Sequence, residues 1–124
     1  MIDERTEKLL IQAVYSDADA KHYFLDHLSD AVVFQHILDI IEESDSGDAR
    51  MKGAFYVSKF AETLLRSAED RLLNMMDDEW DSVAVHIMVA LSRIKSERAL
   101  TKILDNRVKP VLHWEAVALK NYFQ

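Results

Sequence analysis

The sequence predicts an all-α fold, and three observations support this prediction. Apolar residues recur at helical spacing along the whole chain, and no stretch alternates as a half-buried strand does. Only one proline and two glycines interrupt the 124 residues. A helix pair in the C-terminal half also repeats itself. We therefore expect about eight antiparallel helices in a single domain, residues 1–124, which is long enough to bury a core of its own.

Apolar periodicity and capping residues set the expected boundaries of the helices. Ser16, Ser67 and Ser96 each stand where a hydroxyl can accept a hydrogen bond from a first-turn amide. Residues 44–50, SDSGDAR, are the one loop-like segment. The expected helices cover residues 3–15, 17–28, 30–43, 50–66, 68–77, 81–95, 97–105 and 109–123.

The internal repeat has an offset of 28 residues. SVAVHIMVALSRI, from residue 82, aligns with PVLHWEAVALKNY, from residue 110. A weaker earlier copy, HILDIIEES from residue 36, aligns with RLLNMMDDE from residue 71, with extra residues in the loop after it. In a repeated helix pair, each unit buries its apolar face only against its neighbours. The expected core residues of the repeats are Leu72, Met75, Met76, Val83, Ile87, Met88, Leu91, Leu100 and Leu104.

DDEWDSVAVHIMVALSRIKSERALTKILDN, from residue 77, resembles a HEAT-type repeat. It has an acidic turn, an apolar helix ending in Ala-Leu-x-x-Ile, a short turn and a second helix. The resemblance covers residues 68–123 well and residues 30–66 loosely, although the glycine after Val-Ala-Leu and the turn proline before Ser82 are absent. It implies an α-solenoid, or α-α superhelix, of HEAT-like helical hairpins stacked with a right-handed twist. Such a fold leaves the function open.

The charge of the chain is concentrated in its first half. Residues 1–56 contain 12 acids and 5 bases, whereas residues 57–124 contain 10 of each, and the net charge is −7. A negative surface repels nucleic-acid phosphates and anionic lipid. We therefore expect neither nucleic acid nor a membrane as a direct partner, and we expect a basic protein instead.

The acidic half centres on DIIEESDSGD, from Asp39 to Asp48, with five acids and no base. A like-charge pair at i,i+4 spacing, such as Asp39 and Glu43, costs about 0.2–0.5 kcal/mol. Glu42 and Glu43 also lie at a helix C-terminus, where the macrodipole disfavours anions. A solvated helix face is one interpretation, but the repulsion favours a surface that binds something positive. The expected partner-binding residues are Asp17, Asp19, His22, Tyr23, Asp26, Asp30, Asp39, Glu42, Glu43, Asp45, Asp48, Asp78, Glu79 and Trp80.

Asp78, Glu79 and Trp80 belong to a second acidic group with two interpretations. Acids before a helix bind its first amides and suit its dipole, so Asp81 or Ser82 should cap the next helix. Trp80 is alternatively an interface anchor, because tryptophan is enriched at binding hot spots. Under the capping interpretation, which we favour, changing the two acids should affect stability only slightly.

Patterns typical of catalysis or metal binding are missing from the sequence. Asp19, His22 and Asp26 are suitable ligand types, but the Asp-x-Asp-x-Asp-Gly…Glu spacing of a calcium loop does not follow, and no His-Glu-x-x-His motif occurs. A Gly-rich phosphate loop and a Gly-x-Ser-x-Gly motif are also missing. We therefore predict no catalytic residue, no metal site, no cofactor and no enzymatic activity.

Two features bear on the location of the protein. The chain has no cysteine, which excludes thiol chemistry and fits a reducing compartment. MIDERTEKLL is charged from its third residue, unlike a signal peptide, and no apolar run approaches the roughly 20 residues of a membrane span. We predict a cytoplasmic protein.

In its size, charge and lack of a catalytic set, the chain resembles bacterial toxin-immunity proteins of the contact-dependent growth inhibition type. That resemblance implies a basic toxin domain, in particular a nuclease, as the partner that the chain binds and neutralises. Electrostatic complementarity would speed such capture. The alternative is a non-catalytic HEAT-like scaffold or regulatory adaptor, and a helical-repeat enzyme would require a ligand cleft.

Overall fold

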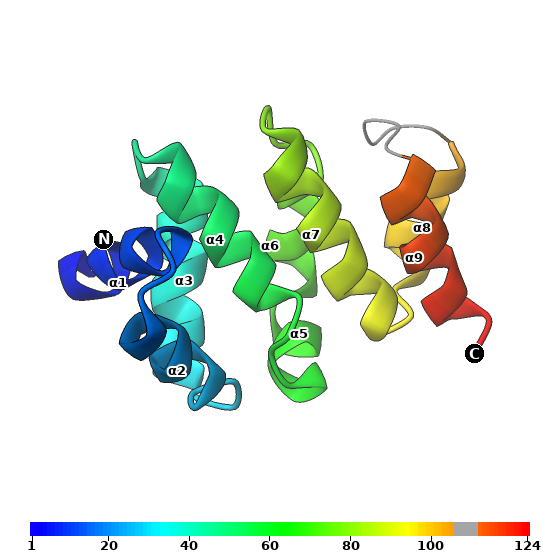
Figure 1. The fold of residues 1–124 in the computed structure, drawn as a ribbon. Coiled ribbons are helices and arrows are strands. Elements are labelled where there is room, and N and C mark those ends of the chain that lie inside the picture. Colours follow the sequence, from blue (N-terminus) through cyan, green and yellow to red (C-terminus); the bar gives the residue numbers. More distant parts are fainter. Residues whose placement is uncertain (106–111) are drawn as a thin grey trace.

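A computed structural model describes the backbone at residues 1–105 and 112–124, and the side chains at residues 1–105 and 115–124. This part of the chain forms α-helices and no strand, so the predicted all-α fold is confirmed (Figure 1). None of its helices has the length and apolar character that a membrane span requires. The helices are α1 (Glu4–Val14), α2 (Ala18–Leu25), α3 (Ala31–Glu43), α4 (Gly47–Val57), α5 (Glu62–Ser67), α6 (Glu69–Met75), α7 (Asp81–Arg93), α8 (Glu97–Leu104) and α9 (Leu112–Tyr122).

The helices stack as hairpins in two layers. In Figure 1, α4, α7 and α9 lie side by side across the front, and α3, α6 and α8 lie behind them. Helix α7 packs against both α4 and α9 within the front layer, while α3 packs on α4 and α6 on α7 between the layers. Helices α1 and α2 close the N-terminal end, where α1 packs against α2, α3 and α4. The arrangement is the expected stack of helical hairpins.

The predicted repeat corresponds to two consecutive hairpins. Helix α6 begins at Glu69 and α8 begins at Glu97, which are 28 positions apart, and each is followed by a helix of the front layer. The earlier, weaker copy corresponds to α3 and α4. Its extra residues were expected in a loop at residues 44–50, but the loop covers only residues 44–46. Helix α4 begins at Gly47, because the Ser46 hydroxyl accepts a hydrogen bond from the Ala49 amide and caps it.

A single helix over residues 50–66 was also expected, and the structure breaks it at residues 58–61. The buried Phe60 ring turns inward, and the Ala61 amide donates to the Leu28 carbonyl at 2.9 Å. Arg93 Nη1 donates to the carbonyls of Ser58 and Phe60, at 2.9 and 2.6 Å. These long-range bonds satisfy backbone groups that a continuous helix would pair internally, and α5 follows the break.

Of the three predicted serine caps, one is confirmed. The Ser96 hydroxyl accepts from the Ala99 amide at 3.2 Å and caps α8. Ser16 instead has a positive φ of 66° at the end of the α1–α2 turn, and the carboxylate of Asp17 caps α2. Ser67 ends α5 and donates to a carbonyl of its own helix. The residue next to the expected cap therefore does the capping at α2.

The core is one cluster that runs through the whole stack. The inner face of α3 is buried, and Phe34 packs on Phe60 with ring centroids 5.0 Å apart. Gly53 allows α4 to approach α3, because an added Cβ would lie 3.2 Å from Ile37 Cγ2 and 3.3 Å from Ile41 Cγ1. The buried residues of the α3 face are Val33, Phe34, Ile37, Leu38 and Ile41.

The predicted core of the repeats is buried except at α8. Ala99 and Ile103, four residues apart, form the inward side of α8. Leu100 is therefore only half-buried, and Leu104 is 65% exposed, so the prediction of Leu104 as a core residue is wrong. The confirmed core residues are Leu72, Met75, Met76, Val83, Ile87, Met88 and Leu91.

Leu91→Ala should lower the free energy of unfolding by roughly 2–5 kcal/mol, because Leu91 is fully buried in α7 and its loss leaves a cavity. Leu104→Ala removes the same atoms from an exposed position and should change stability by less than about 0.5 kcal/mol. Denaturant-induced unfolding measures both values, and equal losses would contradict this assignment of the core.

Candidate binding surfaces

The acids at the end of α3 have a cation within the chain. Arg71 on α6 donates through Nη2 to Asp39 Oδ1 at 3.0 Å and to Glu42 Oε1 at 2.5 Å. Its Nη1 donates to Gln35 Oε1 at 2.8 Å. Hydrogen bonding to Glu42, and then to Asp39, raises the pKa of Arg71. Asp39 and Glu42 therefore have a counter-charge within the chain, and it follows them by about 30 positions in the sequence.

The same pattern recurs at the next hairpin. Arg98 on α8 donates through Nη2 to Glu69 and Asp70 on α6, each at 2.6 Å. Lys102 Nζ lies 2.8 Å from Asp77 Oδ2. A cation of one hairpin thus pairs with acids of the preceding one. These pairs are partly exposed, so each contributes little to the stability of the fold.

Asp78 is bound more deeply than the capping interpretation predicts. Its side chain is 10% exposed and pairs with Arg50 of α4, whose side chain is 14% exposed. Arg50 Nε also donates to the Ile41 carbonyl at 2.9 Å. Asp78 Oδ1 accepts from the Trp80 amide at 2.9 Å, while Glu79 lies farther out, 3.8 Å from Arg50. Asp78 therefore connects the turn between α6 and α7 to α4.

Trp80 is the N-cap residue of α7, and no side chain makes the capping bond there. The predicted cap by Asp81 or Ser82 is therefore wrong. The Asp78 carboxylate instead accepts from the amide of Trp80, the residue before Asp81. The Trp80 side chain packs over the start of α4, where an added Cβ on Gly47 would lie 2.9 Å from Trp80 Cη2. Trp80 is 47% exposed, so part of its ring faces outward.

Three further predicted acids have local structural partners. Asp17 caps α2, and Asp30 caps α3 by accepting from the amides of Val32 and Val33 at 2.9 and 3.1 Å. Asp48 Oδ2 accepts from the Tyr15 hydroxyl at 3.3 Å. These three carboxylates contribute to local structure whether or not they contact a partner.

Most of the predicted partner-binding residues on α2 and at its C-cap lie on the surface. Asp19, His22 and Asp26 are exposed. Among the side chains described, no three His, Asp or Glu residues come close enough together to hold a metal ion. Tyr23 is half-buried, and its ring lies 4.3 Å from the His27 ring with the Arg5 guanidinium 5.4 Å from its centroid. Tyr23 is therefore held by its neighbours.

Two predicted acids, Glu43 and Asp45, lie in a surface hollow of about 380 Å³ where α1 meets the turn between α3 and α4. Glu4 and Glu7 of α1 face the same hollow. Within the described residues, no Lys or Arg side chain comes within 4.0 Å of any of these four carboxylates. We call this the acidic hollow, and its lining residues are Ile2, Glu4, Glu7, Glu43, Asp45 and Ser46.

Bonds between the N-terminal segment and the C-terminal end of α3 hold the walls of the acidic hollow. Glu7 Oε2 accepts from the Ser44 hydroxyl at 2.6 Å, which fastens α1 to the α3–α4 turn. The amino group of Met1 lies 3.2 Å from Glu43 Oε2. The sequence-based prediction missed Glu4 and Glu7, although their i,i+3 spacing on the first expected helix places them on one face.

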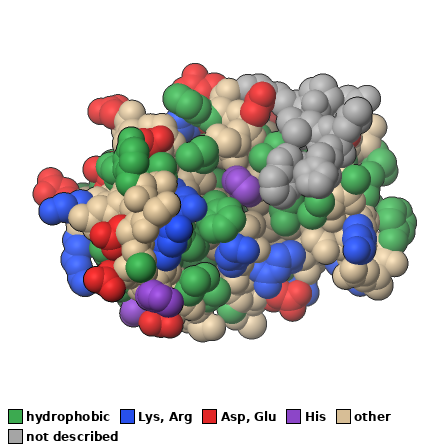
Figure 2. Space-filling view, in the orientation of Figure 1, with side chains coloured by type: hydrophobic (Ala, Val, Ile, Leu, Met, Phe, Trp, Pro, Cys, Tyr) green, Lys and Arg blue, Asp and Glu red, His purple; other side chains and the backbone are tan. Residues whose placement is uncertain are grey.

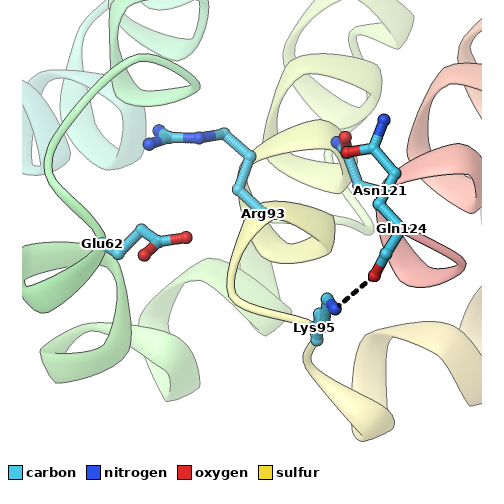
Figure 3. Close-up of a pocket in the computed structure, with 5 residues that line it drawn as sticks. All are labelled: Glu62, Arg93, Lys95, Asn121 and Gln124. Carbon is cyan, nitrogen blue, oxygen red and sulfur yellow. Dashed lines mark hydrogen bonds between the residues drawn. The ribbon is translucent and has the colours of Figure 1, made fainter.

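A different hollow, of about 320 Å³, lies near the C-terminal end of α9, and Figure 3 shows it. The side chains of Arg93, Lys95 and Asn121, which line it, make hydrogen bonds within the chain. Arg93 extends away toward the break after α4, where it holds two carbonyls, and Lys95 Nζ donates to the Gln124 carbonyl at 2.9 Å. Asn121 donates to the Ser92 hydroxyl at 2.8 Å. Such groups do not converge on a ligand.

The sequence also predicts that His113 is exposed and that Trp114 lies in the core or on the repeat-stacking surface. Both side chains lie outside the described residues.

Comparison with family models, curated proteins and solved structures finds no match to the chain.

Asp78→Ala should lower the free energy of unfolding by about 3 kcal/mol, since it leaves the nearly buried Arg50 guanidinium without its carboxylate. Glu79→Ala is the matched control, because this neighbouring side chain is 81% exposed, and it should cost less than about 1 kcal/mol. Thermal and denaturant unfolding measure the difference. Equal, small effects of both variants would restore the simple capping interpretation.

Proposed function

We propose that the chain is a non-catalytic binding protein that captures a basic partner protein at the acidic hollow. One observation carries the proposal. The carboxylates of Glu4, Glu7, Glu43 and Asp45 gather around one hollow without a lysine or arginine side chain of the described residues within 4.0 Å. Gathered like charges repel each other, and a cation from outside would remove that cost.

The surroundings of the hollow suit an arginine or lysine side chain. A guanidinium pairs with carboxylates through two parallel hydrogen bonds, and such charge-assisted bonds are among the stronger ones. Ile2 adds an apolar wall for the aliphatic stem of the entering side chain. The uneven charge of the chain would also steer a basic partner toward this end of the molecule.

We place the interface on only part of the surface that the sequence predicts. Asp39, Glu42 and Asp78 already hold arginines of the chain, so they are less suited to receive a partner's cation. Of the predicted acids at the end of α3 and in the turn after it, Glu43 and Asp45 have no arginine or lysine partner within the described residues, and the two acids of α1 lie beside them. The proposed interface is therefore the N-terminal end of the stack.

The biological role that best fits this proposal is that of an immunity protein, which binds and neutralises a basic toxin domain such as a nuclease in the cytoplasm. The support is the resemblance in size and charge, together with a site suited to a cationic surface. A non-catalytic scaffold or regulatory adaptor is the second candidate, because a stack of helical hairpins serves that role equally. The two roles differ in whether the captured protein loses its activity.

The test is co-expression with the C-terminal domain of a secreted toxin encoded next to this gene. The native chain should protect the cells and co-purify with that domain. Glu43→Lys combined with Asp45→Lys should slow association at low ionic strength by at least about tenfold, because both acids contribute to the steering field. Stopped-flow or surface-based kinetics measure the rate, and rising salt should slow the native chain too.

A charge-matched control distinguishes the effect of the acidic hollow on association from the effect of net charge. Glu62→Lys with Glu97→Lys changes the net charge by the same amount, from −7 to −3, at exposed positions outside the acidic hollow. This pair should slow association far less. Equal slowing by both pairs would reduce the effect to net charge, and normal binding by the Glu43/Asp45 variant would refute the proposed site.

A further inference from the structure

A groove between α2 and α4 has a character opposite to the net charge of the protein. It has a volume of about 380 Å³ and combines three lysines with an apolar wall. Figure 2 shows basic side chains gathered across the middle of the face on which α4 and α7 lie. We call it the lysine groove, and its lining residues are Lys21, Leu25, Lys52, Phe55, Tyr56 and Lys59.

The fold of α4 places two of the lysines over one aromatic ring. Lys52, Phe55 and Lys59 follow helical spacing, with Lys59 just beyond the end of α4. Lys52 Nζ lies 4.4 Å and Lys59 Nζ 4.8 Å from the Phe55 ring centroid. The same ring forms a T-shaped pair with the His86 ring of α7, with centroids 5.6 Å apart. Cation–π contacts of this kind orient the ammonium groups but leave their charge unneutralised.

The three ammonium groups have no anionic counterpart in the described part of the chain. No carboxylate there comes within 4.0 Å of Lys21, Lys52 or Lys59. Burial lowers the pKa of Lys52, and the charges of Lys21 and Lys59 lower it further. The pKa of His86 is lowered by its burial and then by Lys52 and Lys59. The groove therefore holds a positive field that an anion would relieve.

We propose that the lysine groove binds a small organic phosphate of about the size of a nucleoside monophosphate. The ammonium groups of Lys21, Lys52 and Lys59 would bind the phosphoryl oxygens, while Leu25 and Tyr56 would contact the apolar part of the ligand. A volume of about 380 Å³ lies within the usual range of small-molecule sites, roughly 300–1,000 Å³.

The charge of the groove favours phosphate over carboxylate. A phosphomonoester carries about 1.5 to 2 negative charges at neutral pH and three acceptor oxygens, so one compact group can serve several lysines. Lysine binds phosphate as a point charge and needs no bidentate geometry. A peptide carboxylate brings one charge, and several acids would have to converge on one small groove. Inorganic phosphate alone would leave the apolar wall exposed, and Leu25 is 48% exposed there.

The inference does not depend on the proposed capture of a basic protein. The lysine groove and the acidic hollow share no lining residue. Changes in one surface therefore leave the other chemically intact, and the two proposals can fail separately.

The experiment is isothermal titration of the full chain at low ionic strength with adenosine 5′-monophosphate. Adenosine, which lacks the phosphate, and inorganic phosphate, which lacks the apolar part of the nucleotide, are the two control ligands. The nucleotide should bind at least about tenfold more tightly than either, because only the nucleotide uses both halves of the groove. No binding of the nucleotide, or equal binding of adenosine or inorganic phosphate, would overturn the proposal.

Variants show whether binding occurs in the groove. Lys52→Gln and Lys59→Gln should each weaken nucleotide binding by at least about tenfold, since each removes a charged donor. Lys8→Gln and Lys120→Gln remove exposed lysines outside the groove and should bind as the native chain does. Unfolding curves of all four variants should match the native curve. Native-like nucleotide binding by Lys52→Gln, or tighter binding of poly-glutamate than of the nucleotide, would overturn the proposal.

Discussion

The close approach of α4 to its neighbours is the constraint on which the rest of the structure depends. Helix α4 packs against α1, α3 and α7, so it joins the N-terminal helices to the repeated hairpins. Gly53 makes this possible at α3, where an added Cβ would meet the side chains of Ile37 and Ile41 at 3.2 and 3.3 Å. Both surfaces are tied to this placement. The turn that leads into α4 forms part of the acidic hollow, and one side of α4 forms a wall of the lysine groove.

Acidic residues have two distinct roles in this protein, and the position of the nearest cation separates them. Asp39 and Asp78 each receive an arginine from another helix, which connects successive hairpins. Glu4 and Asp45 lie at the N-terminal end of the stack and receive no such arginine from the described residues. Acids between hairpins are therefore paired with arginines of the chain. The acids at the end of the stack are left to interact with another molecule.

Local patterns predict much of the fold, but they do not predict contacts between distant segments. The 28-residue repeat identifies the hairpins α6–α7 and α8–α9, and apolar spacing identifies the buried face of α3. The break after α4 depends on hydrogen bonds from Ala61 to Leu28 and from Arg93 to two carbonyls. Helical propensity describes single residues and does not predict such long-range bonds. The pairing of Arg71 with Asp39 and Glu42 could not be predicted for the same reason, because about 30 residues separate the arginine from the two acids. The three lysines of the groove are spread over residues 21–59, where acids outnumber bases. The net charge of this segment therefore gives no indication of a basic groove.

The two surfaces imply that net charge and local charge act at different distances. At 0.15 M salt the Debye length is about 8 Å, so a net charge of −7 guides a protein partner only over a short approach. A small anion that reaches the lysine groove is governed by ammonium groups in contact with it, and contacts in partly buried sites are screened less than distant charges. An acidic protein can therefore carry a site for an anion without contradiction. Such a site requires a fold that holds the ammonium groups together and away from carboxylates. The groove between α2 and α4 provides this arrangement.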